Sequence, residues 1–281
     1  MPAPNRSHSA TLIARCKVPD GARGAKFGQS LLTTHTISQF SYSGTELDAV
    51  AEATNYYRWI IDSFDGAFGE RIVEAGAGIG TVSALVLQRA SPREMLLIEP
   101  AENNIPELRR RFSNDPRVGV HHGYLEEIGA TVVADTVIAV NVLEHVEHDI
   151  DFLRAAHRTL APGGSLLLLV PALPALYGSL DKAFDHYRRY TKSGLRKSLL
   201  TAGFEIETLH YLNIVGVAAW FAAGRIFRRT TLGRPQVQLY DRWVIPWLRR
   251  IESRIHPPLG QSLLAIARKP AFTAQRKAKR S

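Results

Sequence analysis

Short runs of consecutive apolar residues alternate along this chain with stretches whose apolar positions recur at helical spacing. The runs are typical of strands buried on both faces, as in a parallel sheet, and the stretches are typical of helices that cover it. The strands expected are 71–76, 95–100, 118–123, 135–142, 165–172, 204–212 and 261–269. The helices expected are 45–64, 81–90, 104–112, 149–160 and 191–203. This alternation predicts a doubly wound α/β fold.

The chain divides into parts of different character. Residues 1–44 show little periodicity and are expected to form a flexible arm or lid, whereas 45–270 form one domain. Thr45 is the expected N-cap of the first helix, and 162-PGG-164 the expected end of the helix at 149–160. Residues 213–259 are expected to form a mostly helical insertion, packed on the sheet edge or over the site. The final segment, 271–281, is expected to be a basic, disordered tail.

The net charge of +9 is concentrated at the two ends of the chain. Residues 1–40 carry +4 and residues 268–281 carry +6, so residues 41–267 sum to −1. Solvated tails account for this distribution, and a tail that contacts phosphate is the alternative. The near-neutral remainder, whose tryptophans do not interleave with lysines, argues against nucleic acid as a partner.

Cysteine content and hydropathy argue against disulfide-rich, cysteine–zinc, secreted and membrane-spanning proteins. A single cysteine, Cys16, excludes an intramolecular disulfide framework and a cysteine-based zinc cluster, and we predict no metal site. The N-terminus lacks the apolar run of a secretory signal. The longest apolar run, 214-IVGVAAWFAAG-224, is shorter than the ~20 residues that a spanning helix needs. We therefore expect a cytoplasmic protein without an integral membrane segment.

A glycine-rich turn, 74-EAGAGIG-80, directly follows an expected strand and directly precedes a helix. Glycines let the backbone turn tightly and approach a ligand, and a helix start offers free N–H groups. The dinucleotide-binding spacing G-x-G-x-x-G would place glycine at position 81, where this chain has Thr81. With an acid two residues ahead of G-x-G-x-G, the turn resembles the first motif of class I S-adenosylmethionine-dependent methyltransferases.

The resemblance covers roughly residues 45–270. Glu99, in 96-LLIEP-100, stands where that family places the acid that binds both ribose hydroxyls. The segment 141-NVLEHVEHD-149 resembles the fourth-strand motif of the small-molecule, methyltransferase type 11/12-like branch, and 162-PGGSLLLLVP-171 resembles the strand that follows. The resemblance implies a Rossmann-like seven-stranded sheet, mostly parallel with an antiparallel last strand, helical cap elements, and S-adenosyl-L-methionine as cofactor.

The resemblance also implies which residues hold the cofactor. Glu74 and the backbone of 76–78 would hold its amino-acid half, while Asn141 and Val142 would lie near the transferred methyl group. Where many relatives carry an acid that contacts adenine, this chain has Tyr124, so backbone groups of 123–125 or Glu126 would take that place. The cofactor-binding residues expected are Glu74, Gly76, Ala77, Gly78, Glu99, Pro100, Gly123, Tyr124, Leu125, Asn141 and Val142.

Methyl transfer requires alignment of the acceptor and, for some nucleophiles, removal of a proton. The catalytic candidates are His186, Tyr190 and His145. His186 lies in 177-YGSLDKAFDHYRRYTKSGL-195, on the loop that passes the substrate cavity in this family, and a subgroup of bacterial methyltransferases carries a similar segment. The adjacent Asp185 would orient His186 as a general base. The alternative is that Asp181, His186 and the arginines at 188–189 only cap the next helix and pin the loop.

Aromatic residues are expected to line the acceptor site, with core or lid packing as the alternative for each: Tyr42, Tyr56, Tyr57, Trp59 and Tyr187. Aromatic walls favour a planar small molecule such as a phenol or indole of secondary metabolism, methylated on O, N or C. One alternative is a membrane-peripheral enzyme of a lipid-linked or glycan substrate, using 225-RIFRRTTLGR-234 beside the apolar run. A non-catalytic cofactor-binding module is another. The chain is expected to be a monomer or homodimer.

Overall fold

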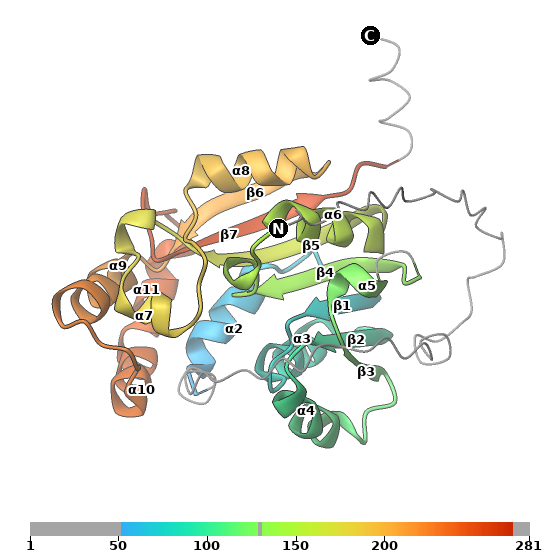
Figure 1. Cartoon of the computed structure of the whole chain (residues 1–281), viewed down its shortest axis with the longest axis horizontal. Coiled ribbons are helices and arrows are strands. Elements are labelled where there is room, and N and C mark those ends of the chain that lie inside the picture. The colour runs from blue at the N-terminus through green and yellow to red at the C-terminus, as the bar shows by residue number, and fades with distance from the viewer. Residues whose placement is uncertain (1–51, 129–130, 272–281) are drawn as a thin grey trace, which may run out of the picture.

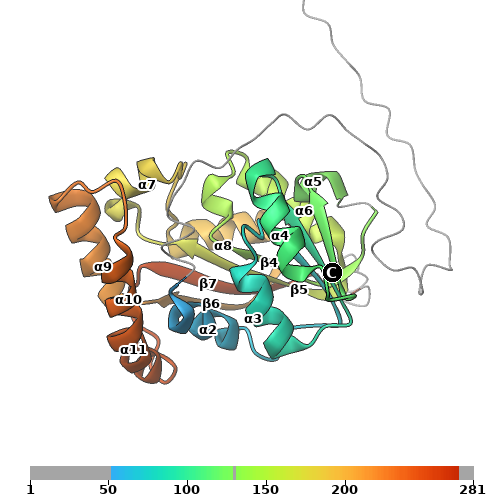
Figure 2. The ribbon, with the colours of Figure 1, turned by 90° about the horizontal axis from the view of Figure 1, so that it is seen from below.

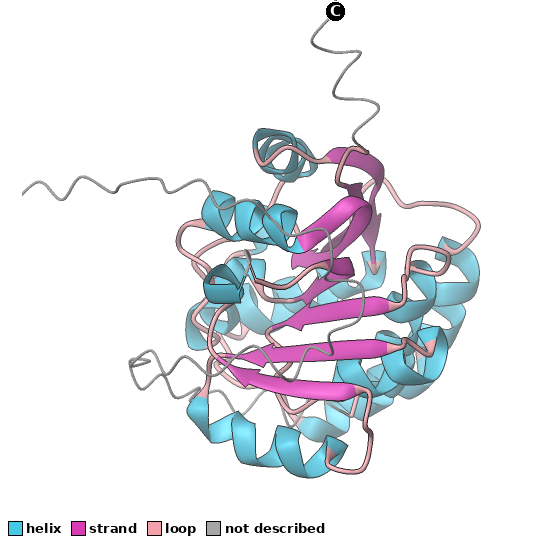
Figure 3. Cartoon of the chain, turned by 90° about the vertical axis from the view of Figure 1, so that its right-hand side faces the viewer, coloured by secondary structure: helices cyan, strands magenta, loops and turns pink. Residues whose placement is uncertain are grey.

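The computed structural model describes residues 52–128 and 131–271, which form a seven-stranded sheet with helices on both faces (Figure 1, Figure 3). The strands are β1 (Arg71–Ala75), β2 (Glu94–Glu99), β3 (Val118–His122), β4 (Ala134–Val140), β5 (Leu160–Pro171), β6 (Glu205–Leu212) and β7 (Ser262–Arg268). Their spatial order is β3-β2-β1-β4-β5-β7-β6, and β7 runs antiparallel to both neighbours. The expected sheet is confirmed, including its antiparallel last strand.

Two hydrophobic clusters join the helices to the two faces of the sheet. One cluster includes α5 (Leu125–Ile128), α6 (Asp149–Thr159) and α8 (Lys192–Thr201). The other includes α2 (Thr54–Ser63), α3 (Thr81–Ala90), α4 (Ile105–Phe112) and α11 (Ile245–Glu252). On β5, Leu166 and Leu168 belong to the first cluster, whereas Leu167 and Leu169 belong to the second. Because both faces are covered, this strand is a continuous apolar run.

Two boundaries differ from the sequence prediction. Helix α6 ends at Thr159 and β5 begins at once, so 162-PGG-164 lies within the strand rather than in a turn. Gly163 has φ +82° there, and the pairing of β4 with β5 shifts register near this irregular start. Helix α2 begins at Thr54. The predicted N-cap Thr45, the arm 1–44 and residues 272–281 of the predicted tail lie outside the described residues.

Between β6 and β7 the chain forms a helical cap, defined as residues 214–259. It contains α9 (Ile214–Phe221), the π-helical turn η5 (Ala222–Ile226), α10 (Arg234–Trp243) and α11. Figure 2 shows these helices as a layer across one end of the sheet, with α7 (Ser179–Ala183) beside α9. The hydroxyl of Ser179 donates to the Gly224 carbonyl oxygen at 3.0 Å, which ties α7 to the cap.

Across the described parts of the chain, none of the helices combines the length and the apolar character that crossing a membrane requires.

Candidate active site

The carboxyl ends of four parallel strands meet at one edge of the sheet. Strand β1 pairs with β2 and β4, and β2 pairs with β3, so that Glu99 stands opposite His122. The predicted cofactor residues at or just beyond these ends are Gly76, Glu99, Gly123 and Asn141. Ligands of open α/β sheets bind at this edge. The fold therefore brings four separate sequence motifs to one place.

Glu99 ties the end of β2 to the glycine-rich turn. Its Oε2 accepts a hydrogen bond from the backbone N–H of Gly78 at 2.7 Å. Its Oε1 accepts from the backbone N–H of Ala101 at 3.0 Å and from the side-chain amide of Asn104 at 3.1 Å. Burial raises the pKa of Glu99, and these hydrogen bonds oppose that rise. The carboxylate is thus held in a fixed position beside the turn.

Glu74 anchors the other side of the turn. It is buried at the end of β1, and its Oε2 accepts a hydrogen bond from the hydroxyl of Ser83 at 2.6 Å, in the first turn of α3. Burial raises the pKa of Glu74 to about 8, and the hydrogen bond from Ser83 opposes the rise. Glu74 therefore connects the strand to the helix that follows the turn.

The turn needs glycine because its backbone is left-handed. Gly76, Gly78 and Gly80 have φ angles of +69°, +55° and +82°. A Cβ on Gly76 would lie 2.6 Å from Cγ2 of Val142, so this residue, just beyond β4, leaves no room for a side chain there. Ala77 donates its N–H to the Ile98 carbonyl oxygen at 3.0 Å, which seats the turn against β2.

At the end of β3 the predicted adenine contacts occupy different environments. Gly123 donates its N–H to the Glu99 carbonyl oxygen at 3.1 Å. Tyr124 is 39% exposed, and its backbone N–H donates to Oε2 of Glu127 at 3.2 Å. The Leu125 side chain is buried in the core. The carbonyl oxygen of Pro100 accepts a hydrogen bond from Nε2 of His122 at 3.2 Å. This pair joins β2 to β3 beside that edge.

A cavity of about 510 Å³ lies between this edge, the loop at 172–190 and the cap. Its aromatic lining residues are Tyr56, Tyr57, Phe184, Trp220, Phe227 and Tyr240. Its polar lining residues include Asn141, Glu144, His145, His186, Arg189 and Asp241. Asn141 directly follows β4 and has φ +54°. Among the predicted cofactor residues, Asn141 is the one that lines this cavity.

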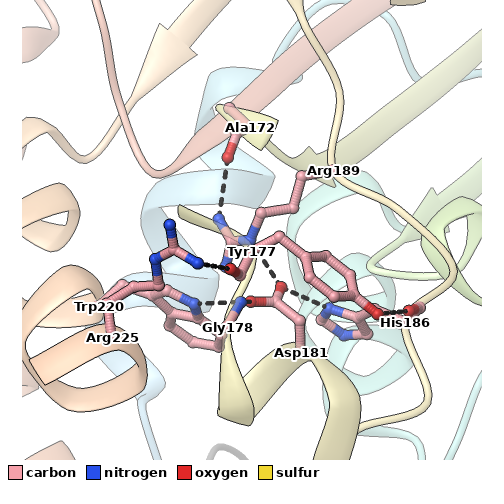
Figure 4. A network of polar contacts seen from close by, with 8 residues as sticks. All are labelled: Ala172, Tyr177, Gly178, Asp181, His186, Arg189, Trp220 and Arg225. Atoms are coloured by element: carbon pink, nitrogen blue, oxygen red, sulfur yellow. Dashed lines mark hydrogen bonds and ion pairs between the residues drawn. The ribbon is translucent and has the colours of Figure 1, made fainter. Parts of the chain in front are cut away.

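Asp181 organises the loop beside this cavity (Figure 4). Its Oδ1 accepts hydrogen bonds from Nδ1 of His186 at 3.1 Å and Nε of Arg189 at 2.6 Å. Its Oδ2 accepts from the backbone N–H of Gly178 at 2.9 Å and the indole N–H of Trp220 at 3.2 Å. Burial alone would raise the pKa of Asp181, but these partners lower it below its ordinary value. An ionised carboxylate therefore binds Nδ1–H of the imidazole and leaves Nε2 able to accept a proton.

The loop is closed at its base, which fixes the position of His186. Ala172 forms a bridge with Tyr190, and the Arg189 side chain donates to the Ala172 carbonyl oxygen at 2.9 Å. The backbone N–H of Tyr187 donates to the Glu144 carbonyl oxygen at 2.8 Å. The orienting carboxylate is that of Asp181 and not that of the adjacent Asp185. This corrects the expectation that the adjacent Asp185 orients His186. Asp181 contacts the ring instead, because it lies about one turn earlier in the chain, on α7.

Two further titratable groups of the cavity come from the turn η3 (Leu143–His145). The rings of His145 and His186 meet edge to face, with centroids 4.8 Å apart. Glu144 is buried, and its Oε2 has no hydrogen-bond partner among the described residues. Burial raises the pKa of Glu144 to about 7 and lowers that of His145 to about 4. Ligand atoms of all three residues lie within 4.8 Å of one another, so they can hold a divalent metal ion or an acceptor's polar group.

Several predicted site residues lie away from the cavity. Trp59 is buried in the hydrophobic cluster that includes α2, and Tyr187 is 56% exposed, so neither of them lines this cavity. Tyr190 is buried, and its hydroxyl lies 3.2 Å from the Leu143 carbonyl oxygen and from Oδ2 of Asp149. These contacts hold the loop against η3 and α6, so the Tyr190 hydroxyl does not face the cavity. Tyr42 lies outside the described residues.

The helical insertion was predicted to pack on the sheet edge or over the site, but its cavity-lining residues were not predicted. Trp220, Tyr240 and Asp241 line the cavity, and Phe184 does so from the loop. The apolar run 214–224 predicts a helix but not which face turns inward. Asp241 could have been noticed as one of two acids among many arginines. Its role as a partner of α2, whose Asn55 and Tyr56 N–H groups it binds at 3.0 and 2.8 Å, requires the fold.

Comparison with known proteins agrees with this architecture. A family model described as a methyltransferase domain matches residues 34–209, more than half of the chain. A Mycolicibacterium smegmatis protein named "Probable S-adenosylmethionine-dependent methyltransferase" is 30% identical over 154 residues, covering 53% of this chain and 58% of that protein. An uncharacterized 37.1 kDa protein of transposon TN4556 of Streptomyces fradiae is 28% identical over 181 residues, covering 58% and 52%. The chain thus matches just over half the length of these relatives.

Solved structures share the fold at low sequence identity. An S-adenosylmethionine-dependent methyltransferase of Mesorhizobium loti has a TM-score of 0.53 and 16% identity, covering 79% of this chain and 99% of that one. The [4+2]-cyclase SpnF has a TM-score of 0.52 and 19% identity, covering 78% and 82%. Proteins with different reactions share this fold, so the acceptor chemistry must be argued from the site.

The strand order, the glycine-rich turn and the acid that ends β2 define a class I S-adenosylmethionine-dependent methyltransferase. The chain belongs to the methyltransferase domain family whose model it matches. S-adenosylmethionine is the cofactor of this class.

Proposed function

We propose that this chain transfers the methyl group of S-adenosylmethionine to a small acceptor held in the cavity, with His186 as general base. The buried Asp181–His186 pair carries the proposal, because its imidazole lines the cavity. The same cavity is lined by Asn141, which belongs to the edge where the cofactor motifs meet. Membership of the methyltransferase domain family supports the transfer itself.

The residues at the strand ends fit the cofactor. Gly76 and Gly78 have left-handed backbones and present no side chain, which gives a ligand close access to the turn. The Glu99 carboxylate suits two adjacent ribose hydroxyls, since it can accept two hydrogen bonds at once. Glu74 supports the turn from behind through Ser83. When bound, S-adenosylmethionine supplies a methyl group already activated by its sulfonium sulfur.

His186 and Asp181 handle the proton of the acceptor. Nε2 of His186 accepts the proton from the hydroxyl or amine that is methylated, and the imidazole becomes an imidazolium. The Asp181 carboxylate, ionised and 3.1 Å from Nδ1, stabilises that positive charge and fixes the ring. Arg189 and Trp220 hold the carboxylate on its other sides. The proton therefore goes to a base whose orientation is set by buried contacts.

The shape and chemistry of the cavity support a planar acceptor. Aromatic rings from α2, the loop and the cap line it, and such rings favour stacked or edge-to-face contact with a phenol or indole. Tyr56 is itself fixed by a hydrogen bond to Oγ of Ser262 at 3.2 Å, and burial raises its pKa to about 12, so it remains neutral. Glu144 and His145 offer polar partners on the opposite side.

Turnover by His186→Gln tests this proposal. Purified protein is incubated with S-adenosylmethionine and a panel of substituted phenols and indoles, and S-adenosylhomocysteine release is measured. We expect cofactor affinity to stay within about twofold, while kcat falls about 10²–10⁴-fold with the loss of the base. His148→Gln, at an exposed position of the 141–149 segment, is the matched control and should keep wild-type turnover. Wild-type turnover by His186→Gln would reduce His186 to a structural role.

Two alternatives give different results in the same assay. A non-catalytic module would bind S-adenosylmethionine and turn over no acceptor. A membrane-peripheral enzyme would act on a lipid-linked or glycan acceptor, and the exposed apolar and basic surface of the cap favours this candidate. A monomeric or homodimeric state and a cytoplasmic location stay predictions.

A further inference from the structure

The cap exposes an unusual number of large apolar side chains. Ten of the fourteen exposed large apolar residues of the described chain belong to it: Val215, Phe221, Ile226, Phe227, Leu239, Trp243, Trp247, Ile251, Ile255 and Leu259. Single exposed apolar residues are ordinary, but a contiguous set usually marks an interaction site. The set includes both exposed tryptophans, the residue type that anchors proteins at membrane–water interfaces.

Along α10, α11 and the residues just after α11, the exposed apolar residues form a regular series, the apolar stripe. They recur at every fourth position and are 58–70% exposed: Leu239, Trp243, Trp247, Ile251 and Ile255. Backbone hydrogen bonds from Val244 to Tyr240 and from Leu248 to Val244 carry the helical path across the junction. The opposite side is buried, with Ile245 and Leu248 in the core. The two helices thus present a second apolar face that nothing in the described chain covers.

The charges of the cap are arranged around this face. Residues 214–259 contain eight arginines, no lysine and two acids, which gives a net charge of +6. Both acids are buried: Asp241 binds the first N–H groups of α2, and Glu252 binds those of Asn213 and Ile214. The cap therefore exposes arginines and no acid of its own, and two of these arginines, Arg234 and Arg249, pair with Glu52 and Asp62 outside the cap.

Three of these arginines border the stripe directly. Arg242, Arg250 and Arg254 repeat at four- and eight-residue spacing, one position away from the apolar series. The guanidinium of Arg242 lies 5.5 Å from the ring centroid of Trp243. An amphipathic helix with tryptophan on one side and arginine beside it is typical of a segment that lies in the plane of a membrane surface.

An exposed part of the cap also lines the cavity. Phe227 is 67% exposed and lines the cavity, as does Arg229 two residues on. Both follow η5, which packs on α7 of the loop that carries Asp181. The wall of the cavity thus includes exposed residues of the cap.

We propose that the outer face of the cap docks on the surface of an anionic lipid bilayer and receives an amphipathic acceptor from it. The apolar stripe enters the headgroup region, and the arginines bind lipid phosphates. The reacting head of the acceptor enters the cavity past Phe227, while its apolar chain stays in the bilayer. The acceptor part of this inference rests on the proposed methyl transfer, whereas the docking does not.

The positive charge of the cap favours an anionic bilayer over the other partners that could cover this apolar face. A second copy of this chain would bring one net positively charged surface against another, and like charges oppose that contact. An anionic bilayer satisfies the apolar stripe and the arginines together, with about 1 kcal/mol gained per arginine near the surface.

Cosedimentation of the full chain with vesicles tests the docking. One set of vesicles is phosphatidylcholine, and the other adds phosphatidylglycerol. We expect binding to the anionic vesicles that weakens with salt. The double variant Trp243→Ser/Trp247→Ser should bind more than tenfold more weakly. The triple variant Arg242→Gln/Arg250→Gln/Arg254→Gln should lose about 100-fold, or about fivefold per arginine. Leu200→Ser and Arg196→Gln, exposed on α8, are matched controls and should bind within twofold of wild type.

Further measurements make the test decisive. Calorimetric affinity for S-adenosylmethionine should be unchanged in the tryptophan variant, which separates failure of docking from failure of the methyl-transfer site. The proposal is overturned if wild type does not bind anionic vesicles, or if both cap variants bind as wild type does. A concentration-dependent dimer that the tryptophan variant abolishes, without vesicle binding, would assign the face to a second copy. Binding to immobilised polyglutamate in place of vesicles would assign it to an acidic protein.

Discussion

Asp181 is the residue on which the loop at 172–190 depends. Its two oxygens accept four hydrogen bonds, from an imidazole, a guanidinium, an indole and a backbone amide. Its side chain is fully buried, as is almost all of Arg189. A buried ion pair is costly to break because the remaining charge has no partner. The same carboxylate therefore fixes the position of His186 and holds Trp220 of the cap against the loop.

Replacing Asp181 with asparagine should destabilise the fold. The change leaves the Arg189 guanidinium buried without its counter-charge, so we expect the free energy of unfolding to fall by about 3–5 kcal/mol. Urea unfolding followed by circular dichroism measures this loss. Asp185→Asn is the matched control, because the Asp185 carboxylate is not the orienting group, and it should stay near wild type. Equal stability of the two variants would contradict the network.

Glu74 should make stability depend on pH. Its pKa is about 8 in the folded protein and near the ordinary 4.5 in the unfolded chain, so the folded state holds the extra proton between these values. The free energy of unfolding therefore falls as pH rises through that window, by about 1.4 kcal/mol per pH unit from this group. Glu74→Gln should lose this contribution, and its stability relative to wild type should rise from pH 5 to pH 8. If urea unfolding shows that the stabilities of wild type and Glu74→Gln change with pH in the same way, the argument that burial raises the pKa of Glu74 is contradicted.

At the residue scale, the sequence predicted where the glycine turn and the strand-end carboxylate lie, but not the side-chain partner of His186. Gly76 and Glu99 could be predicted because a left-handed turn and a strand-end carboxylate leave a signature within a few residues. Asp181 could not be predicted as the partner of His186, because this pairing depends on α7 folding back toward the imidazole ring. Trp59 and Tyr56 are three positions apart on one helix, yet one packs in the core and the other faces the cavity.

The cap is joined to the domain through helix N-termini. Asp241 on α10 accepts the backbone N–H groups of Asn55 and Tyr56 at 3.0 and 2.8 Å, at the start of α2. Glu252 on α11 does the same for Asn213 and Ile214 at the start of α9. Free N–H groups at a helix start favour an acid, here supplied by a different helix.

Asp241→Ala should loosen α2 and the cap together. Two buried N–H groups lose their acceptor, so we expect the free energy of unfolding to fall by about 1–3 kcal/mol. Hydrogen exchange at the start of α2 should accelerate, and exchange in β1 should change less. Unaltered exchange at Asn55 and Tyr56 would show that Asp241 does not hold this junction.

At the element scale, the continuous apolar runs predicted the strands to within a few residues at most ends. The exceptions have physical reasons. The start of β5 was missed because Pro162, Gly163 and Gly164 are turn residues that here lie in a strand with a register shift. Helix α7 was missed because its five residues are too few to show a period. The faces of the cap helices depend on burial of Asp241 and Glu252, which composition does not reveal.

At the scale of the whole molecule, two candidate sites meet at one edge of the sheet. We propose that the glycine turn and Glu99 hold the cofactor, and that the cavity between α2, the loop and the cap holds the acceptor. These segments lie far apart in the sequence, so only the fold joins them. Topology explains why the fold class and cofactor could be predicted from ordered motifs, whereas the acceptor pocket could not.

The central claim is that Glu99 and the glycine turn hold S-adenosylmethionine, and calorimetric titration of the cofactor into Glu99→Ala tests it most directly. We predict measurable affinity in wild type and a loss of about 100-fold or more in the variant, since two hydrogen bonds to a charged group are removed. Glu102→Ala, an exposed acid three residues on, should bind as wild type does, and circular dichroism verifies that both variants fold. Wild-type affinity in a folded Glu99→Ala protein would contradict the site.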